Sequence, residues 1–121
     1  MMTLIAEIGV ALVAALHFWF CILEMFLWQK PLGLKIFKLD KQFAQRSATL
    51  AANQGLYNLF LSAGLVWSLL TNDVTQALQL KIFFLGCVVI AGVFGGITVS
   101  KRITLVQALP AAITLLLLWT A

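Results

Sequence analysis

The stretch Ala51-Ala52-Asn53-Gln54-Gly55-Leu56-Tyr57-Asn58-Leu59-Phe60-Leu61-Ser62-Ala63 lies within one of several long apolar segments of this chain. It nevertheless carries two asparagines, a glutamine and a tyrosine in close succession. A polar side chain without hydrogen bonds in hydrocarbon costs several kcal/mol, so such residues are kept where they have a partner or a task. We therefore expect a buried polar site among membrane-spanning helices.

The composition of the chain supports the membrane class. Its 121 residues are 63% hydrophobic and only 10% charged. A soluble domain of this size leaves much of its surface in water and cannot hide so much apolar area. The first apolar run has no basic segment before it and no small-residue cleavage site after it, which predicts a retained span instead of a cleaved signal peptide. We expect one integral membrane domain over residues 1–121.

Four segments have the length and character of membrane spans. A helix needs about 20 mostly apolar residues to cross a bilayer. The segments cover approximately residues 4–28, 47–70, 79–99 and 103–119. The predicted fold is an all-α membrane protein, a bundle of four transmembrane helices.

The basic residues predict the orientation of these spans. Between the first and second spans lie Lys30, Lys35, Lys38, Lys41 and Arg46, and between the third and fourth lie Lys101 and Arg102. The other side has only Lys81, with Glu7 and Asp73. The positive-inside rule places both basic loops in the cytoplasm and both termini outside, and the bias argues against dual topology. The net charge of +4 is then explained by basic residues that face anionic lipid headgroups, and it does not indicate nucleic-acid binding.

The first basic loop has a pattern of its own. Over residues 32–45, apolar side chains such as Leu34, Ile36 and Phe37 alternate with lysines. This pattern is typical of a segment that lies on the membrane surface. We expect an interfacial segment there.

The first two spans carry polar stripes at matching depths. In the first span the stripe is His17, Cys21 and Glu24, at helical spacing i, i+4, i+7. In the second span it is Asn53, Gln54, Tyr57 and Asn58. A rise of about 1.5 Å per residue puts Glu24 at the level of Asn53 and Gln54, and His17 at the level of Tyr57 and Asn58. Antiparallel neighbours should turn these stripes toward each other, so we expect hydrogen bonds between residues at the same level.

The last two spans contribute one polar residue and several packing residues. Gln107 is expected near the level of Glu24, as a further hydrogen-bonding partner. Pro110 has no N–H to donate, which frees a carbonyl one turn earlier. Gly92 and Gly96 form a small-xxx-small surface for close packing, either within the bundle or in a homodimer through the third helix.

The chain resembles the bacterial four-span family known as domain-of-unknown-function family 1304. The resemblance covers nearly the whole sequence, and the Asn-Gln-Gly-x-Tyr-Asn run is its specific element. Its motifs are His17 with Glu24-Met25-Phe26-Leu27-Trp28, Asn53-Gln54-Gly55-Leu56-Tyr57-Asn58, Gly92 with Gly95-Gly96, and Gln107-Ala108-Leu109-Pro110-Ala111. The resemblance implies the four-span topology and adds no activity. We accordingly expect a multi-pass protein of the bacterial inner membrane.

No motif implies a cofactor, and none predicts a metal. His17 and Glu24 lie about 10.5 Å apart along their helix axis, too far to share one ion. A single histidine leaves one axial position of a haem unassigned. Cys21 and Cys87 show no CxxC spacing, so neither a disulfide nor a zinc site is expected.

Three functions remain open. The leading one is binding or transport of a small amphipathic or lipid ligand at His17, Glu24 and the Asn/Gln/Tyr cluster, with proton linkage. The second is a membrane enzyme that uses His17 and Glu24 for acid–base chemistry on a lipid or isoprenoid. The third is a structural or partner-binding subunit in which the polar residues only join helices.

Overall fold

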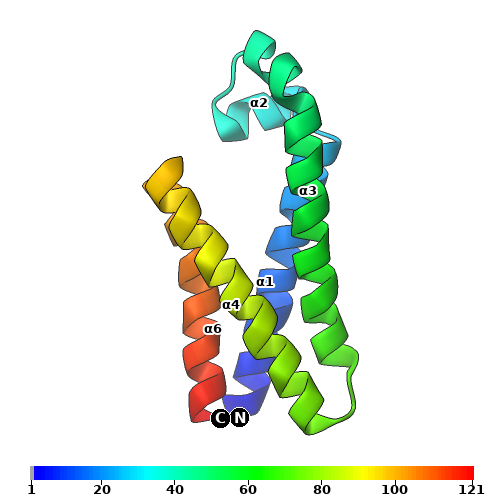
Figure 1. Cartoon of the computed structure of the whole chain (residues 1–121), viewed down its shortest axis with the longest axis vertical. Helices are drawn as coiled ribbons and strands as arrows, with labels where there is room; N and C mark the ends of the chain where they lie inside the picture. Colours follow the sequence, from blue (N-terminus) through cyan, green and yellow to red (C-terminus); the bar gives the residue numbers. More distant parts are fainter. Residues whose placement is uncertain (1) are drawn as a thin grey trace.

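The computed structural model describes residues 2–121, with side chains from residue 3 onward, and every element in it is helical (Figure 1). The elements are α1 (Met2–Met25), α2 (Pro31–Phe37), α3 (Lys41–Leu70), α4 (Val74–Thr98), α5 (Lys101–Ile103), η1 (Thr104–Ala108) and α6 (Leu109–Thr120). Helix η1 is a π-helical segment, and α5, η1 and α6 follow one another without a break. The prediction of an all-α fold is confirmed.

Side chains at the loops set where the helices begin. The Asp40 carboxylate accepts the backbone N–H of Phe43 at 2.7 Å, and the Asp73 carboxylate accepts that of Gln76 at 2.9 Å. These two caps satisfy amide donors at the starts of α3 and α4. Helix α2 begins with Pro31, whose fixed φ suits a first helical position.

The long helices pack in cyclic order. Helix α1 lies along α3, α3 contacts α4, α4 contacts η1 and α6, and α6 returns to α1. Both termini lie at one end of the molecule, here called the terminal end (Figure 1). Helices α2 and α5 lie at the other end, together with seven of the eight basic residues, so we call it the basic end.

The apolar core lies toward the terminal end. Its buried members are Val10, Val13, Ala14, Leu65, Leu85, Val88 and Ala111, from α1, α3, α4 and α6. Nearby, Lys81 is nine-tenths buried and its Nζ lies 3.7 Å from the Glu7 carboxylate. The apolar packing joins all four long helical segments on this side, whereas Glu24 and Asn58 lie nearer the basic end.

Glycines allow the closest approach between α4 and η1. A Cβ added at Gly92 would lie 2.6 Å from the backbone nitrogen of Ala108, and one added at Gly96 would overlap the Thr104 side chain. The Thr104 hydroxyl donates to the carbonyl of Gly92 at 2.8 Å. The glycine stripe therefore packs inside the chain, against η1.

Three described helical segments are long and apolar enough to cross a bilayer: Thr3–Met25, Val74–Thr98 and Lys101–Thr120. The chain is accordingly a multi-pass membrane protein. Helix α3 is longer, at 30 residues, but its polar and basic side chains make it less apolar than these three. The helices do not have the same ends as the predicted spans: α1 ends at residue 25, α3 begins at residue 41, and α4 begins at residue 74, where Asp73 caps it.

Candidate functional site

The polar stripe of α1 is buried at His17 and partly accessible at Glu24. His17 is fully buried, Cys21 is nearly so, and Glu24 is half-buried. The His17 Nδ1 atom lies 2.9 Å from the Val13 carbonyl oxygen, one turn earlier. Since a carbonyl only accepts hydrogen bonds, Nδ1 carries the proton.

The other ring nitrogen of His17 contacts a residue of η1. Its Nε2 atom lies 3.1 Å from the amide nitrogen of Gln107, which can only donate. The two contacts together define one neutral tautomer, with Nδ1 donating and Nε2 accepting. The predicted partners of His17, Tyr57 and Asn58, are wrong because η1 turns Gln107 into the space beside the imidazole.

The backbone of η1 explains how Gln107 reaches that position. Pro110 cannot donate to the carbonyl one turn before it, and the Leu109 N–H bonds instead to the Thr104 carbonyl, five residues back. This extra residue in the turn widens the helix over residues 104–108, a form that often occurs at functional sites. Gln107 lies in that widened turn and is nine-tenths buried.

Glu24 pairs with Asn58 on the neighbouring helix. The Asn58 Nδ2 group donates to Glu24 Oε1 at 2.5 Å. A Cβ added at Gly55 would lie 3.2 Å from the Cys21 carbonyl and 3.1 Å from the Glu24 Cβ, so Gly55 lets α3 approach α1 at this level. Without that close approach, the short Asn58 side chain could not reach the carboxylate.

The predicted levels are nearly right, whereas the predicted partners are wrong. Gly55 lies opposite Cys21, and the Ser62 hydroxyl donates to the Ala14 carbonyl at 2.8 Å. This register puts Glu24 close to the predicted level of Asn53, yet its partner is Asn58. Side chains lean toward the start of their own helix, so those of antiparallel helices lean toward each other and meet between the expected levels.

The remaining polar residues of α3 divide between the cavity and the outer face. Asn53 and Tyr57 are exposed, and Tyr57 packs beside Phe60 with ring centres 6.2 Å apart. Gln54 is exposed too, but it lines the cavity described next. The buried stripe of α3 is Ala51, Gly55, Asn58 and Ser62. Small residues at i, i+4, i+7 and i+11 are the sequence signal that identifies the face toward α1.

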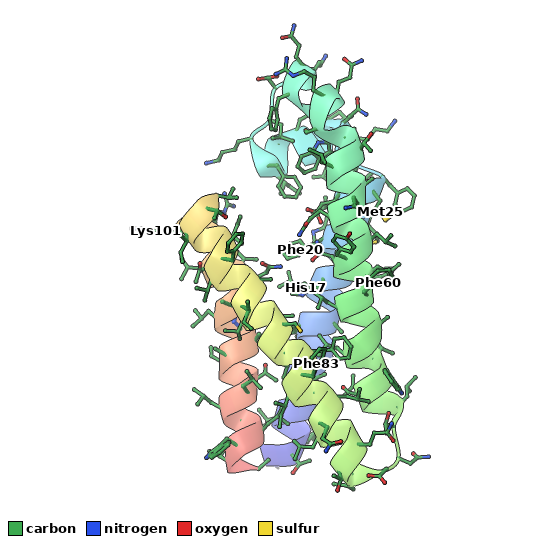
Figure 2. The ribbon with its side chains drawn as sticks, viewed as in Figure 1. His17, Phe20, Met25, Phe60, Phe83 and Lys101 are labelled. Carbon is green, nitrogen blue, oxygen red and sulfur yellow. The ribbon has the colours of Figure 1, made fainter. Side chains whose placement is uncertain are left out.

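A cavity of about 540 Å³ opens at the basic end, between the α1–α3 pair and the α4–α5–η1 corner. Its polar lining consists of Glu24, Gln54, Asn58, Ser100 and Gln107, and the exposed cations Lys38 and Arg102 also line it. Apolar walls come from Phe20, Ile36, Phe37, Val99, Ile103 and Val106. Figure 2 shows His17 and Phe20 on α1, and Lys101 at the far tip where α4 has diverged from α3.

Three features of this lining were not expected from the sequence. Lys38 and Arg102 reach the cavity from the two basic loops, and Phe37 lines it from α2. Phe37 also packs against Trp28 with ring centres 4.8 Å apart, and the Trp28 Nε1 group donates to Ser47 at 3.0 Å. Periodicity within each span cannot reveal these residues, because they come together only through the loops.

Glu24 also lines a second, smaller cavity of about 300 Å³. Its lining includes Met25, Trp28, Gln29 and Lys30, at the turn that follows α1. Glu24 is therefore part of the lining of both cavities at the basic end.

Among the described residues, no group of three or more His, Cys, Asp and Glu side chains could hold a metal ion. Cys21 and Cys87 are free thiols, and the Cys21 sulfur lies 3.5 Å from that of Met25. His17, the one histidine of the sequence, does not line the large cavity. The polar groups in that cavity are side-chain amides, one hydroxyl, one carboxyl group and the two cations Lys38 and Arg102.

The family described as "Protein of unknown function (DUF1304)" matches residues 11–119. The chain belongs to this family. A relative in Lactococcus lactis subsp. lactis (strain IL1403), "Uncharacterized protein YpaA", is 29% identical over 108 residues, which cover 88% of this chain and 89% of the relative. No solved structure matches at a significant level. The DUF1304 match spans every residue that lines the large cavity.

Proposed function

We propose that this DUF1304 protein binds a small amphipathic ligand in the large cavity and transports it. The observation that carries the proposal is the joint lining of that cavity by apolar walls and by Glu24, Asn58 and Gln107. Ligand sites are typically concave, mostly apolar and about 300–1,000 Å³ in volume, with a few polar groups that fix orientation. A volume of about 540 Å³ lies within that range.

The proposal includes four spans within a single integral membrane domain. Helix α3 packs along α1 and against α4, two of the candidate spans, and this supports its placement in the same bilayer. The basic end faces the cytoplasm by the positive-inside rule, so both termini face outside the inner membrane and α2 lies on the cytoplasmic surface.

Thiol labelling tests this topology. With Cys21 and Cys87 replaced by alanine, single cysteines at Lys35→Cys and Thr75→Cys flank α3 on its two sides. A maleimide that cannot cross membranes, added to intact cells with permeable outer membranes, should label Thr75→Cys only. Labelling of both positions from one side would contradict the span through α3.

The cavity favours transport over catalysis because His17 is not part of its lining. The histidine is fully buried and both its ring nitrogens have partners, which leaves Glu24 as the one carboxyl group available to a ligand. Reconstituted vesicles should show ligand flux that depends on a proton gradient, and Glu24→Gln should abolish that dependence. The enzyme hypothesis would instead require turnover that His17→Ala abolishes.

Mass spectrometry of compounds retained by the purified protein tests binding itself. Asn58→Leu and Asn53→Leu are matched variants, since both replace an asparagine of α3 and only Asn58 lines the cavity. A compound kept by the wild type and by Asn53→Leu, but lost from folded Asn58→Leu, would support the proposal. Equal retention by all three would refute the cavity as its site, and retention by none would favour a structural subunit.

A further inference from the structure

We propose that the ligand is an amphiphile with an anionic headgroup, which Lys38 and Arg102 bind at the mouth of the large cavity. This inference rests on the proposed function and specifies its ligand. The two cations come from different loops, Lys38 from the end of α2 and Arg102 from α5. Glu24 is the one acidic residue in the same lining, so the cavity carries a net positive charge.

The position of these cations is selective. Lys35 lies one turn before Lys38, and Lys101 lies next to Arg102, yet neither lines the cavity. A general attraction to anionic lipid would use all four residues equally. The geometry instead directs one cation from each basic loop toward a common space.

The backbone at Lys38 provides an independent observation. Among the described residues, Lys38 is the one non-glycine residue with a positive φ, at φ 55° and ψ 48°. Glycine adopts this left-handed conformation far more readily than residues with a Cβ, and a helix commonly ends on a glycine there. Strained conformations of this kind cluster at functional sites. Lys38 nevertheless adopts this less favourable conformation, and it does so at a position that lines the cavity.

The rest of the lining defines how such a molecule would lie. Phosphate or carboxylate oxygens would accept hydrogen bonds from the Arg102 guanidinium and the Lys38 ammonium. The alkyl chain would contact the apolar wall formed by Phe20, Phe37 and Val106. A hydroxyl or ammonium group of the ligand would donate to Glu24, whose carboxylate already accepts from Asn58.

Native mass spectrometry in a neutral maltoside detergent tests this assignment with dodecyl phosphate as the probe. Lys38→Gly removes the ammonium while it keeps, and eases, the left-handed backbone. We expect Lys38→Gly and Arg102→Gln each to raise the apparent Kd about tenfold, the scale of one lost hydrogen bond to a charged group. Lys35→Gln and Lys101→Gln are the matched controls and should stay within about twofold of the wild type.

Further probes separate the ligand classes. Dodecyltrimethylammonium, with the same chain and a cationic head, should bind at least tenfold more weakly than dodecyl phosphate, and tighter binding of the cation would overturn the inference. Inorganic phosphate without a chain should not bind, and its binding with equal affinity would also overturn it. Phosphatidylglycerol competing for the Lys38- and Arg102-dependent site would identify a membrane lipid as the source, whereas failure to compete would favour a single-chain amphiphile; either result is consistent with an anionic headgroup.

The outcomes also distinguish this inference from the proposed function. If dodecyl phosphate binding is weakened by Asn58→Leu but unaffected by Lys38→Gly and Arg102→Gln, the cavity binds amphiphiles and the anionic headgroup is refuted. If none of the three variants changes binding, both are refuted. Circular dichroism of each variant confirms that a weakened Kd does not reflect unfolding.

Discussion

Replacement of Gly92 by alanine should destabilise the protein, because α4 and η1 meet there without room for a methyl group. The added Cβ would lie 2.6 Å from the Ala108 nitrogen and 2.7 Å from the Ala108 Cβ, against ordinary contacts of 3.4–4 Å. The Ala108 nitrogen is a backbone atom, so it cannot move away by a side-chain rotation. The two helices must therefore separate by roughly 1 Å, and overpacking of this kind costs about 1–3 kcal/mol.

Two further terms contribute to the change in the free energy of unfolding. Separation would stretch the hydrogen bond from Thr104 to the Gly92 carbonyl, now 2.8 Å, which contributes about 0.5–1.5 kcal/mol. Alanine regains about 1 kcal/mol because it favours a helix more than glycine does. The expected net loss in the free energy of unfolding is about 0.5–3.5 kcal/mol from these terms together.

Gly86 in the same helix provides the control. A Cβ added there would meet nothing within 4 Å, so Gly86→Ala should be neutral or stabilise by up to about 1 kcal/mol. Unfolding of both variants in mixed micelles, with rising dodecyl sulfate and far-UV circular dichroism as the readout, measures the difference. Equal stability of Gly92→Ala and Gly86→Ala would refute the close packing of α4 against η1.

Three other predictions concern the polar contacts. A double-mutant cycle of Glu24→Gln and Asn58→Leu in the same unfolding assay should give a coupling of about 0.6–2 kcal/mol, and a coupling near zero would mean that the two side chains do not pair. Nitrogen-15 spectra of His17, the one histidine of the sequence, should show the tautomer protonated at Nδ1; the opposite tautomer would contradict both of its contacts. Pro110→Ala restores a backbone donor, so η1 should revert toward α-helix, and the Nε2 resonance should lose the signature of its bond to Gln107 while helix content by circular dichroism is unchanged.

The fold was largely predictable because apolar length and the distribution of basic residues are properties of the sequence alone. Helix type and the approximate positions of the long segments follow from these. The boundary of α4 depended instead on a local cap at Asp73, and the less apolar character of α3 comes from the same polar residues that build the site.

The candidate site was only partly predictable. Depth counting placed the polar residues of α1 and α3 at nearly the right levels, since the rise per residue is constant. It could not give the partners, which depend on how side chains lean and on the π-helical turn before Pro110. Lys38 and Arg102 were visible only as loop charges, because their approach to the cavity depends on how the loops fold.

Photo-crosslinking at two phenylalanines of α1 tests most directly whether an amphiphile occupies the large cavity. Phe20 lines the cavity, whereas Phe18 is half-exposed on another face of the same helix, so p-benzoylphenylalanine at each position reports on a different environment. After irradiation in cells, Phe20 should yield one dominant small-molecule adduct, and Phe18 a mixture that follows the bulk lipid composition. The same bulk mixture at both positions would contradict a selective ligand in the cavity.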